Sequence, residues 1–291
     1  MPQPRLPGES SMGASVHGAV QVITVTGGKG GTGKTTVAVN LATALAQAGR
    51  RVLLLDGDLG LASVDVLLGL TPTHTLEQVL GGTVRLEEIV LRTAEGVSVI
   101  PAASGVARMA RLKPAEHAAI VRGFAALPGD FEILIVDTAP GLNESVLSFC
   151  QAAQQQLIVL RNEPASLTDA YALIKVLSRD YQVNSFRVLV NMARDGTEAH
   201  DLFRRLQRVT DRYLEVALDY AGEIPEDRDV ARAVRGQRSV LAAFPSGPAA
   251  RAYRRLAQDV QRWAPPRASG RLEFFFERLL TRPTARLQVI K

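Results

Sequence analysis

The feature that most constrains the fold of this chain is the stretch 28–36, which spells GKGGTGKTT. It fits the phosphate-loop pattern G-x-x-x-x-G-K-[S/T]. A β-branched run at 20–26 precedes it, and a segment with few helix breakers and an apolar stripe follows at 36–48. A phosphate-binding loop requires a strand, a glycine loop and a helix in that order, so a chance glycine-rich turn is the weaker interpretation. We therefore predict a nucleoside triphosphate site.

The residue types of the loop suit the chemistry of a bound triphosphate. Glycines leave room for backbone N–H groups to close around phosphate oxygens. The Lys34 ammonium can reach the β- and γ-phosphates, and the Thr35 hydroxyl can ligate Mg²⁺. A second lysine, Lys29, lies inside the loop. The predicted cofactor-binding residues of the loop are Gly28, Lys29, Gly30, Gly31, Thr32, Gly33, Lys34, Thr35 and Thr36.

Composition narrows the class of protein. Of the 291 residues 46% are hydrophobic, which is enough for a full core in one α/β domain. The single cysteine, Cys150, excludes a disulfide framework and a cysteine-ligated metal site within one chain, and the four histidines lack ligand spacing. Residues 1–18 lack the apolar core of a secretory signal, and no apolar run is as long as a membrane span, so we expect a cytoplasmic protein. We attribute the net charge of +5 to a solvated surface.

Apolar runs alternate with helical segments along the rest of the chain. Strands are predicted at 51–56, 97–100, 133–137, 156–160, 187–191 and 216–220, and helices near 167–178 and 198–213. We expect an α/β, single-domain P-loop NTPase fold, in which a mainly parallel sheet is flanked by helices on both faces and a C-terminal amphipathic helix follows. The predicted parts are a flexible tail at 1–18, the nucleotide-binding domain at 19–264, and a linker with the C-terminal helix at 265–291.

Acidic residues follow two of the predicted strands. Asp56 and Asp58 come at and after the end of the strand 51–56, and Asp137 ends the strand 133–137 in the arrangement of a Walker-B acid. Because ligands of such sheets bind at the carboxyl ends of the strands, these carboxylates can hold Mg²⁺ or orient an attacking water. A lone aspartate at a strand end could equally cap the next helix, but three around one phosphate loop favour the site.

The spelling KGGTGKTT at 29–36 resembles the deviant Walker-A loop of the MinD/ParA family of ATPases. The likeness continues at 55–65, 136–141 and 224–227. Within the family, the chain is most similar to the flagellar-number regulators of the FlhG/FleN group, a likeness carried by the stretches 64–72, 100–105, 168–175 and 272–279. The resemblance covers nearly the whole chain.

The resemblance implies a cycle that uses ATP and Mg²⁺: a monomer without ATP, a face-to-face dimer with two ATP, slow hydrolysis, and return to the monomer. It implies catalytic roles for Lys29, which reaches the phosphates of the partner subunit, for Lys34, and for Asp58, which positions the attacking water. The implied metal ligands are Thr35, Asp58 and Asp137. Glu163 is expected at the partner's ribose, and the adenine is expected to be framed by Asn191, Pro225, Glu226 and Asp227.

The resemblance also implies a function. Regulators of this group control flagellar number by binding and restraining an AAA+ activator of σ54-dependent flagellar promoters, of the FleQ or FlrA type. The alternative is a positioning or partition ATPase that acts on DNA or a membrane; direct specific DNA binding is not expected. The FlhF GTPase is a further candidate partner, although 1–18 lacks the D-Q-A-x-x-L-R motif with which some relatives stimulate it, and Pro140 replaces the small residue of close relatives. An iron–sulfur carrier is excluded for want of paired cysteines.

The C-terminal segment 271–281 has an apolar face, which consists of Leu272, Phe275, Phe276 and Leu279. One interpretation is a helix that docks on the body when no ATP is bound. The other is an interfacial membrane anchor. Both can hold in different nucleotide states, and the second adds peripheral contact with the inner membrane or the cell pole to the cytoplasmic localisation.

Overall fold

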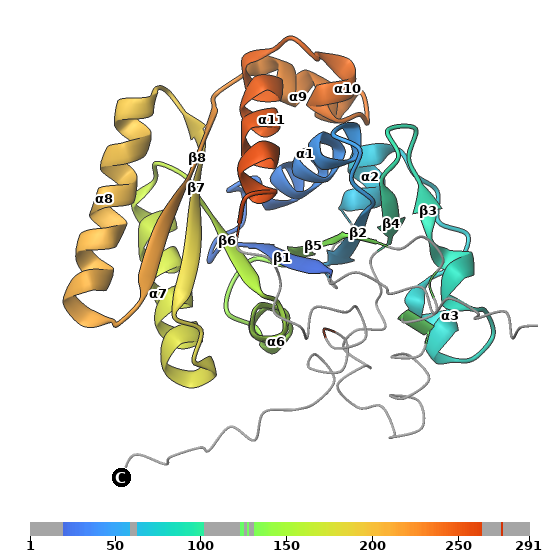
Figure 1. The fold of residues 1–291 in the computed structure, drawn as a ribbon, viewed down its shortest axis with the longest axis horizontal. Helices are drawn as coiled ribbons and strands as arrows, with labels where there is room; N and C mark the ends of the chain where they lie inside the picture. The colour runs from blue at the N-terminus through green and yellow to red at the C-terminus, as the bar shows by residue number, and fades with distance from the viewer. Residues whose placement is uncertain are drawn as a thin grey trace, which may run out of the picture.

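The computed structural model describes residues 20–58, 63–101, 123–124, 127, 131–263 and 275, and these residues form one sheet covered by helices (Figure 1). The eight strands lie in the order β3-β4-β2-β5-β1-β6-β7-β8, and all neighbours are parallel except β3 and β4. Their bounds are β1 Gln21–Thr26, β2 Val52–Gly57, β3 Leu91–Arg92, β4 Ser98–Ile100, β5 Ile133–Thr138, β6 Gln155–Leu160, β7 Ser185–Ala193 and β8 Ala217–Pro225. The predicted α/β fold with a mainly parallel sheet is confirmed.

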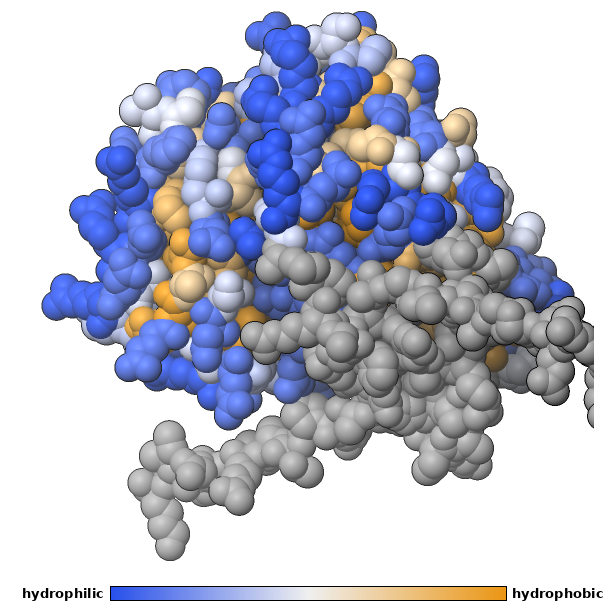
Figure 2. Space-filling view, in the orientation of Figure 1, coloured by the Kyte–Doolittle hydropathy of each residue, from blue (hydrophilic) through white to orange (hydrophobic). Residues whose placement is uncertain are grey.

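Helices cover both faces of the sheet. Helices α1, α9, α10 and α11 lie on one side, and α6, α7 and α8 lie on the other (Figure 1). The helix bounds are α1 Lys34–Gln47, α2 Val64–Leu68, α3 Leu76–Leu80, α6 Glu144–Ala152, α7 Pro164–Tyr181, α8 Gly196–Tyr213, α9 Arg228–Arg235, α10 Val240–Ala243 and α11 Pro248–Val260, with a 3₁₀ turn at Leu86–Ile89. The polar outer surfaces of α8 and α11 are the blue bands of Figure 2.

Burial on both faces explains why the strands read as continuous apolar runs. In β6, Leu157 and Val159 belong to the core beneath α1 and α11, whereas Ile158 and Leu160 belong to the core beneath α6 to α8. All four side chains are buried. Neither face of such a strand has a solvent-exposed row, so the alternation of polar and apolar residues is absent.

Two parts of the sheet differ from the sequence prediction. The strand β8 continues past the predicted end at 220, through Gly222, whose φ of +113° accompanies a register shift against β7. The antiparallel strand β3 has two residues and was not predicted, because a strand of that length has no periodicity to detect. The helices α2, α3 and α10, of five, five and four residues, were missed for the same reason, and α6 and α9 were not predicted either.

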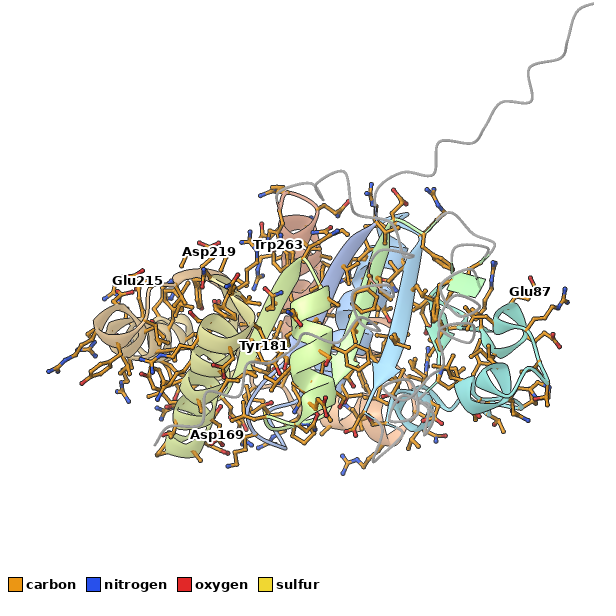
Figure 3. All side chains as sticks on the ribbon, turned by 90° about the horizontal axis from the view of Figure 1, so that it is seen from below. Glu87, Asp169, Tyr181, Glu215, Asp219 and Trp263 are labelled. Atoms are coloured by element: carbon orange, nitrogen blue, oxygen red, sulfur yellow. The ribbon has the colours of Figure 1, made fainter. Side chains whose placement is uncertain are left out.

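One arginine of the sheet, Arg187, contacts the segment that directly follows α11. The Arg187 guanidinium of β7 lies 4.4 Å from the centre of the Trp263 ring and 3.2 Å from an Asp219 oxygen of β8. Figure 3 shows Trp263 and Asp219 on the same side of the molecule. This contact fixes the helix that covers β8.

Most of the predicted terminal parts fall outside the described residues. The tail 1–18 lies outside them, as do Leu272, Phe276 and Leu279 of the C-terminal apolar face. Phe275 is described: its side chain is 2% exposed, and its ring stacks on Phe149 of α6 with 6.5 Å between the centroids. For this residue the position agrees with a helix docked on the body. No described helix is both long and apolar enough to cross a bilayer.

Candidate functional site

The loop between β1 and α1 requires glycine immediately before the helix. α1 begins at Lys34, and Gly33 has a left-handed backbone with a φ of 87°. A side chain at Gly33 would also overlap the amide of Asn191, which donates from Nδ2 to the Thr32 carbonyl at 2.8 Å. Both the backbone conformation and the close approach of β7 exclude a larger residue here.

We expect Gly33→Ala to weaken binding of Mg·ADP about 5-fold to 150-fold, because a side chain in this conformation strains the loop by about 1–3 kcal/mol. Gly196→Ala is the matched control, since a methyl group there meets open space. Isothermal titration calorimetry of both variants checks the result. Equal affinities would show that the loop relaxes without cost.

The rest of the loop is packed on the protein side and open on the other. Gly28 contacts the backbone of Asp169 in α7 so closely that a side chain would overlap it. Thr32 is 2% exposed. Positions 30 and 31 face open space within the described part of the chain, which is the side on which phosphate oxygens could approach the backbone N–H groups.

Lys34 lies folded over the loop. Its side chain is buried, and its Nζ donates to the Lys29 carbonyl oxygen at 3.1 Å. Burial lowers the pKa of Lys34, while the charges of Asp137 and Asp58 oppose that shift. The ammonium therefore lies between the loop and the acidic residues, as a phosphate ligand requires.

Asp137 and Thr35 form a set of oxygen donors that fits Mg²⁺. Asp137 is 0% exposed at the end of β5, and neither carboxylate oxygen has a hydrogen-bond partner among the described residues. Burial raises the pKa of Asp137 to about 8. The Thr35 hydroxyl lies 3.2 Å from the Ser63 hydroxyl. A buried carboxylate without a partner beside a hydroxyl is the donor chemistry of a hard divalent cation.

Asp56 organises the segment that carries Asp58. Its Oδ1 accepts the Asp58 N–H at 3.0 Å, and its Oδ2 accepts the N–H groups of Ser63 and Val64 at 3.0 and 3.1 Å. Burial raises its pKa, and these hydrogen bonds oppose the rise. Sequence reasoning grouped Asp56 with the carboxylates that can hold Mg²⁺ or orient a water, and left capping of the next helix as the alternative. In the structure both Asp56 oxygens accept backbone N–H groups on the two sides of residues 59–62, including that of Val64 at the start of α2.

The structure brings Lys29 and Glu163 together within one chain. Lys29 Nζ lies 2.8 Å from Glu163 Oε2, and Arg161 NH1 lies 3.1 Å from Glu163 Oε1. The Lys29 partner lowers the pKa of Glu163. Both side chains are more than a third exposed, so solvent screens the pair and it is easily exchanged. Sequence reasoning gave each residue a separate contact across a dimer and did not foresee this pair.

A cavity adjoins the loop. Its volume is about 440 Å³, and four predicted residues, Asn191, Pro225, Glu226 and Asp227, line it together with Thr36. We call it the purine cavity, after the base that these residues are expected to frame. Sequence reasoning missed the rest of its wall, which comes from β7, β8, α9 and α11: Met192, Ile224, Arg228, Val230, Ala231, Val234, Arg235 and Tyr253.

Asp227 uses its carboxylate within the protein. Oδ1 accepts the Asp229 N–H at 2.9 Å and so caps α9, and Oδ2 accepts the Ala249 N–H at 3.1 Å at the start of α11. Asp227 therefore has a structural role, because it ties two helices of the cavity wall to each other, and its contact with the base stays a prediction.

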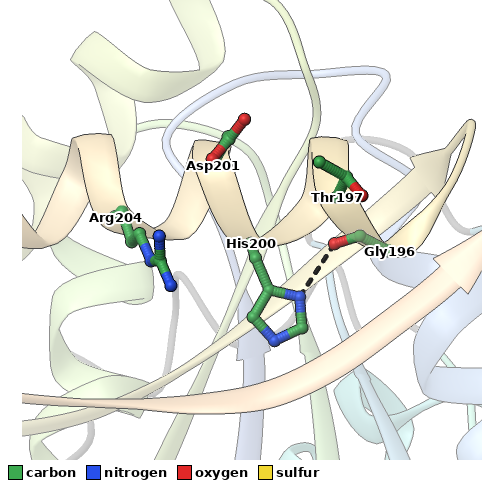
Figure 4. A pocket seen from close by; sticks show the side chains of 5 residues that line it. All are labelled: Gly196, Thr197, His200, Asp201 and Arg204. Carbon is green, nitrogen blue, oxygen red and sulfur yellow. Dashed lines mark hydrogen bonds between the residues drawn. The ribbon is translucent and has the colours of Figure 1, made fainter.

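A second hollow of about 450 Å³ lies along the start of α8 (Figure 4). In it, His200 Nδ1 lies 2.8 Å from the Gly196 carbonyl oxygen, and the His200 ring packs on Tyr220 of β8. Asp201 and Arg204 are exposed on its rim. The hollow includes no residue of the phosphate loop, and sequence reasoning assigned it no function.

Comparison with known proteins places this site in a family. Residues 18–261 match the ParA family model, described as NUBPL iron-transfer P-loop NTPase. The chain is 53% identical to the antiactivator FleN of Pseudomonas aeruginosa, over 92% of this chain and 96% of that protein. It is 30% identical to the flagellum site-determining protein YlxH of Helicobacter pylori, over 77% and 76%.

A solved structure agrees with these sequence matches. The septum site-determining protein MinD of Pyrococcus horikoshii OT3, complexed with Mg-ADP, superposes with a TM-score of 0.65 at 27% identity, over 84% of this chain and 96% of that one. The sequence resemblance to MinD and ParA proteins is thus confirmed. The chain belongs to the ParA/MinD family of P-loop ATPases, enzymes that bind ATP together with Mg²⁺.

Proposed function

We propose that this ATPase regulates flagellar number as an antiactivator that dimerises on ATP and restrains an AAA+ activator of σ54-dependent flagellar promoters, of the FleQ or FlrA type. The observation that carries the proposal is the 53% identity to the antiactivator FleN along almost the full length of both chains. The match to a flagellum site-determining protein supports the flagellar context.

The site residues have distinct roles in this proposal. Lys34 binds the β- and γ-phosphates, and Thr35 and Asp137 hold Mg²⁺, which when bound neutralises charge on the phosphoryl oxygens. Asp58, on the backbone held by Asp56, orients the attacking water. Lys29 leaves Glu163 and reaches the phosphates of the partner subunit, so that hydrolysis depends on dimerisation. Glu163 is then released for the partner's ribose.

The partner surface is proposed on the segment that follows Asp137. Leu142, between β5 and α6, is a large apolar side chain that is 42% exposed. Because this segment directly continues the strand that carries Asp137, the state of the nucleotide site can change its conformation. FlhF and a membrane surface at the inner membrane or the cell pole stay as further candidate partners.

Two measurements test the proposal: the molecular mass of the protein in solution, and its inhibition of the ATPase activity of the activator. With Mg²⁺ and a non-hydrolysable ATP analogue, light scattering should give a dimer, and Asp58→Ala should remain dimeric with ATP because only water activation is lost. The ATPase rate of the activator should fall when this protein and ATP are added, and fall less with Lys34→Ala. A wild-type monomer under these conditions contradicts the dimer, and an unaffected activator contradicts the antiactivator function.

One observation favours the alternative of an ATPase that acts on DNA. Residues 228–262 contain eight arginines and two aspartates, a net charge of +6, which exceeds the +5 of the whole chain. These residues belong to α9, α10, α11 and the turns beside them, whose outer surface is part of the blue, hydrophilic surface of Figure 2. Salt-sensitive, sequence-independent DNA binding by the ATP-bound dimer would support this alternative.

A further inference from the structure

We propose that Tyr253 of α11 determines base recognition: its hydroxyl forms a hydrogen bond with a polar edge atom of the purine in the purine cavity. The inference rests on the proposed use of adenine nucleotides at this site. It assigns a role to a residue that no nucleotide-binding motif of the chain contains.

The position of Tyr253 supports this role. Its side chain is 0% exposed and lines the purine cavity together with Asn191 of β7 and Val230 of α9. Much of the wall is apolar, and apolar side chains suit the faces of an aromatic base. The polar edge of a base requires hydrogen-bond partners in the protein, because its donors and acceptors lose their bound water when the base enters the cavity.

The Tyr253 hydroxyl is such a partner, and it is not used within the described structure. The oxygen is buried and has no hydrogen-bond partner among the described residues. Buried hydroxyls are almost always satisfied. Tyr220 follows that rule, since its hydroxyl donates to Glu223 Oε2 at 2.6 Å. A side chain that lines a cavity and carries an unpaired, buried hydroxyl therefore points to a ligand.

Two other polar side chains of the wall, those of Asn191 and Asp227, are engaged in the protein. Asn191 donates to the Thr32 carbonyl, and Asp227 accepts two backbone N–H groups. Burial raises the pKa of Tyr253, so its hydroxyl is neutral at pH 7 and can both donate and accept. It can pair with a ring nitrogen or with an exocyclic amino group.

The test compares Tyr253→Phe with wild type, using Mg·ADP and inorganic triphosphate as probes. The first probe carries a base, and the second occupies the phosphate loop alone. We expect Tyr253→Phe to bind Mg·ADP about 5-fold to 10-fold more weakly and to bind triphosphate unchanged. Its melting temperature without nucleotide should equal or exceed that of wild type, because an unsatisfied buried hydroxyl is removed. Tyr213→Phe, at a 55% exposed position on α8, is the matched control.

The outcomes separate this inference from the function on which it rests. Unchanged affinity of Tyr253→Phe for Mg·ADP overturns the role of Tyr253, and it shows that the hydroxyl is satisfied by water alone. An equal loss for triphosphate also overturns it, since the substitution then acts on the whole site. A wild-type protein that binds triphosphate but not Mg·ADP contradicts the adenine-nucleotide function itself.

Discussion

Asp137→Asn is expected to stabilise the nucleotide-free protein while it abolishes ATP hydrolysis. The carboxylate is fully buried, and neither oxygen has a hydrogen-bond partner within the described residues. Burial raises its pKa to about 8, although the Thr35 hydroxyl and the Lys34 ammonium oppose the rise. At neutral pH, burying this carboxyl group therefore lowers the free energy of unfolding, because the same group is hydrated and ionised in the unfolded chain. A neutral amide of the same size costs less free energy to bury. The same substitution removes a proposed Mg²⁺ ligand, so hydrolysis should fall at least about a hundredfold.

The pH dependence follows from the direction of the shift. The folded pKa of about 8 lies above the ordinary aspartate pKa of 3.8, so between these pH values the folded state binds a proton that the unfolded state has lost. The contribution of Asp137 to the free energy of unfolding is therefore fully present below about pH 4 and is lost as the pH rises toward 8. The melting temperature of Asp137→Asn should thus exceed that of wild type by at least about 3 °C at pH 8, and the difference should shrink toward pH 5.

Differential scanning calorimetry without nucleotide measures this difference, and phosphate release measures hydrolysis. Asp211→Asn, at an exposed position on α8, is the control and should change neither quantity. A less stable Asp137→Asn would mean that the carboxylate is satisfied in solution. Full hydrolysis by this variant would remove Asp137 from the metal site.

Lys29→Ala is expected to lose ATP hydrolysis by at least about a hundredfold while it still binds Mg·ADP with nearly wild-type affinity. A cation supplied across an interface to a transferring phosphoryl group contributes factors of about 10³ to 10⁵ in rate. Binding within one chain should persist, because Lys34 and the loop backbone are unchanged and Lys29 is held on Glu163 at 2.8 Å.

Steady-state hydrolysis and calorimetric titration separate the two effects for Lys29. Lys175→Ala removes an exposed lysine of α7 and serves as the control for lost positive charge. A large loss of Mg·ADP affinity in Lys29→Ala would indicate that the lysine acts within its own subunit. Unimpaired hydrolysis would exclude the trans role.

Local patterns determined most of the fold. The strand, loop and helix around Gly33 could be predicted, because a phosphate loop depends on residues adjacent in sequence. The buried strands could be predicted because helices on both faces require unbroken apolar runs, as in β6. Asp137 could be placed at the edge of the sheet because the carboxyl ends of parallel strands share that edge.

Tertiary structure alone decided which distant side chains meet. The Lys29–Glu163 pair and the hydrogen bond from Asn191 to Thr32 join residues 134 and 159 positions apart, and no local pattern encodes such separations. Asp227 became a link between two helices only when α11 lay beside α9. Tyr253 reads in the sequence as one apolar residue of an amphipathic helix. Only the packing of α11 against α1 and β8 places Tyr253 in the wall of the purine cavity with its hydroxyl buried, because that packing depends on the whole core rather than on the helix.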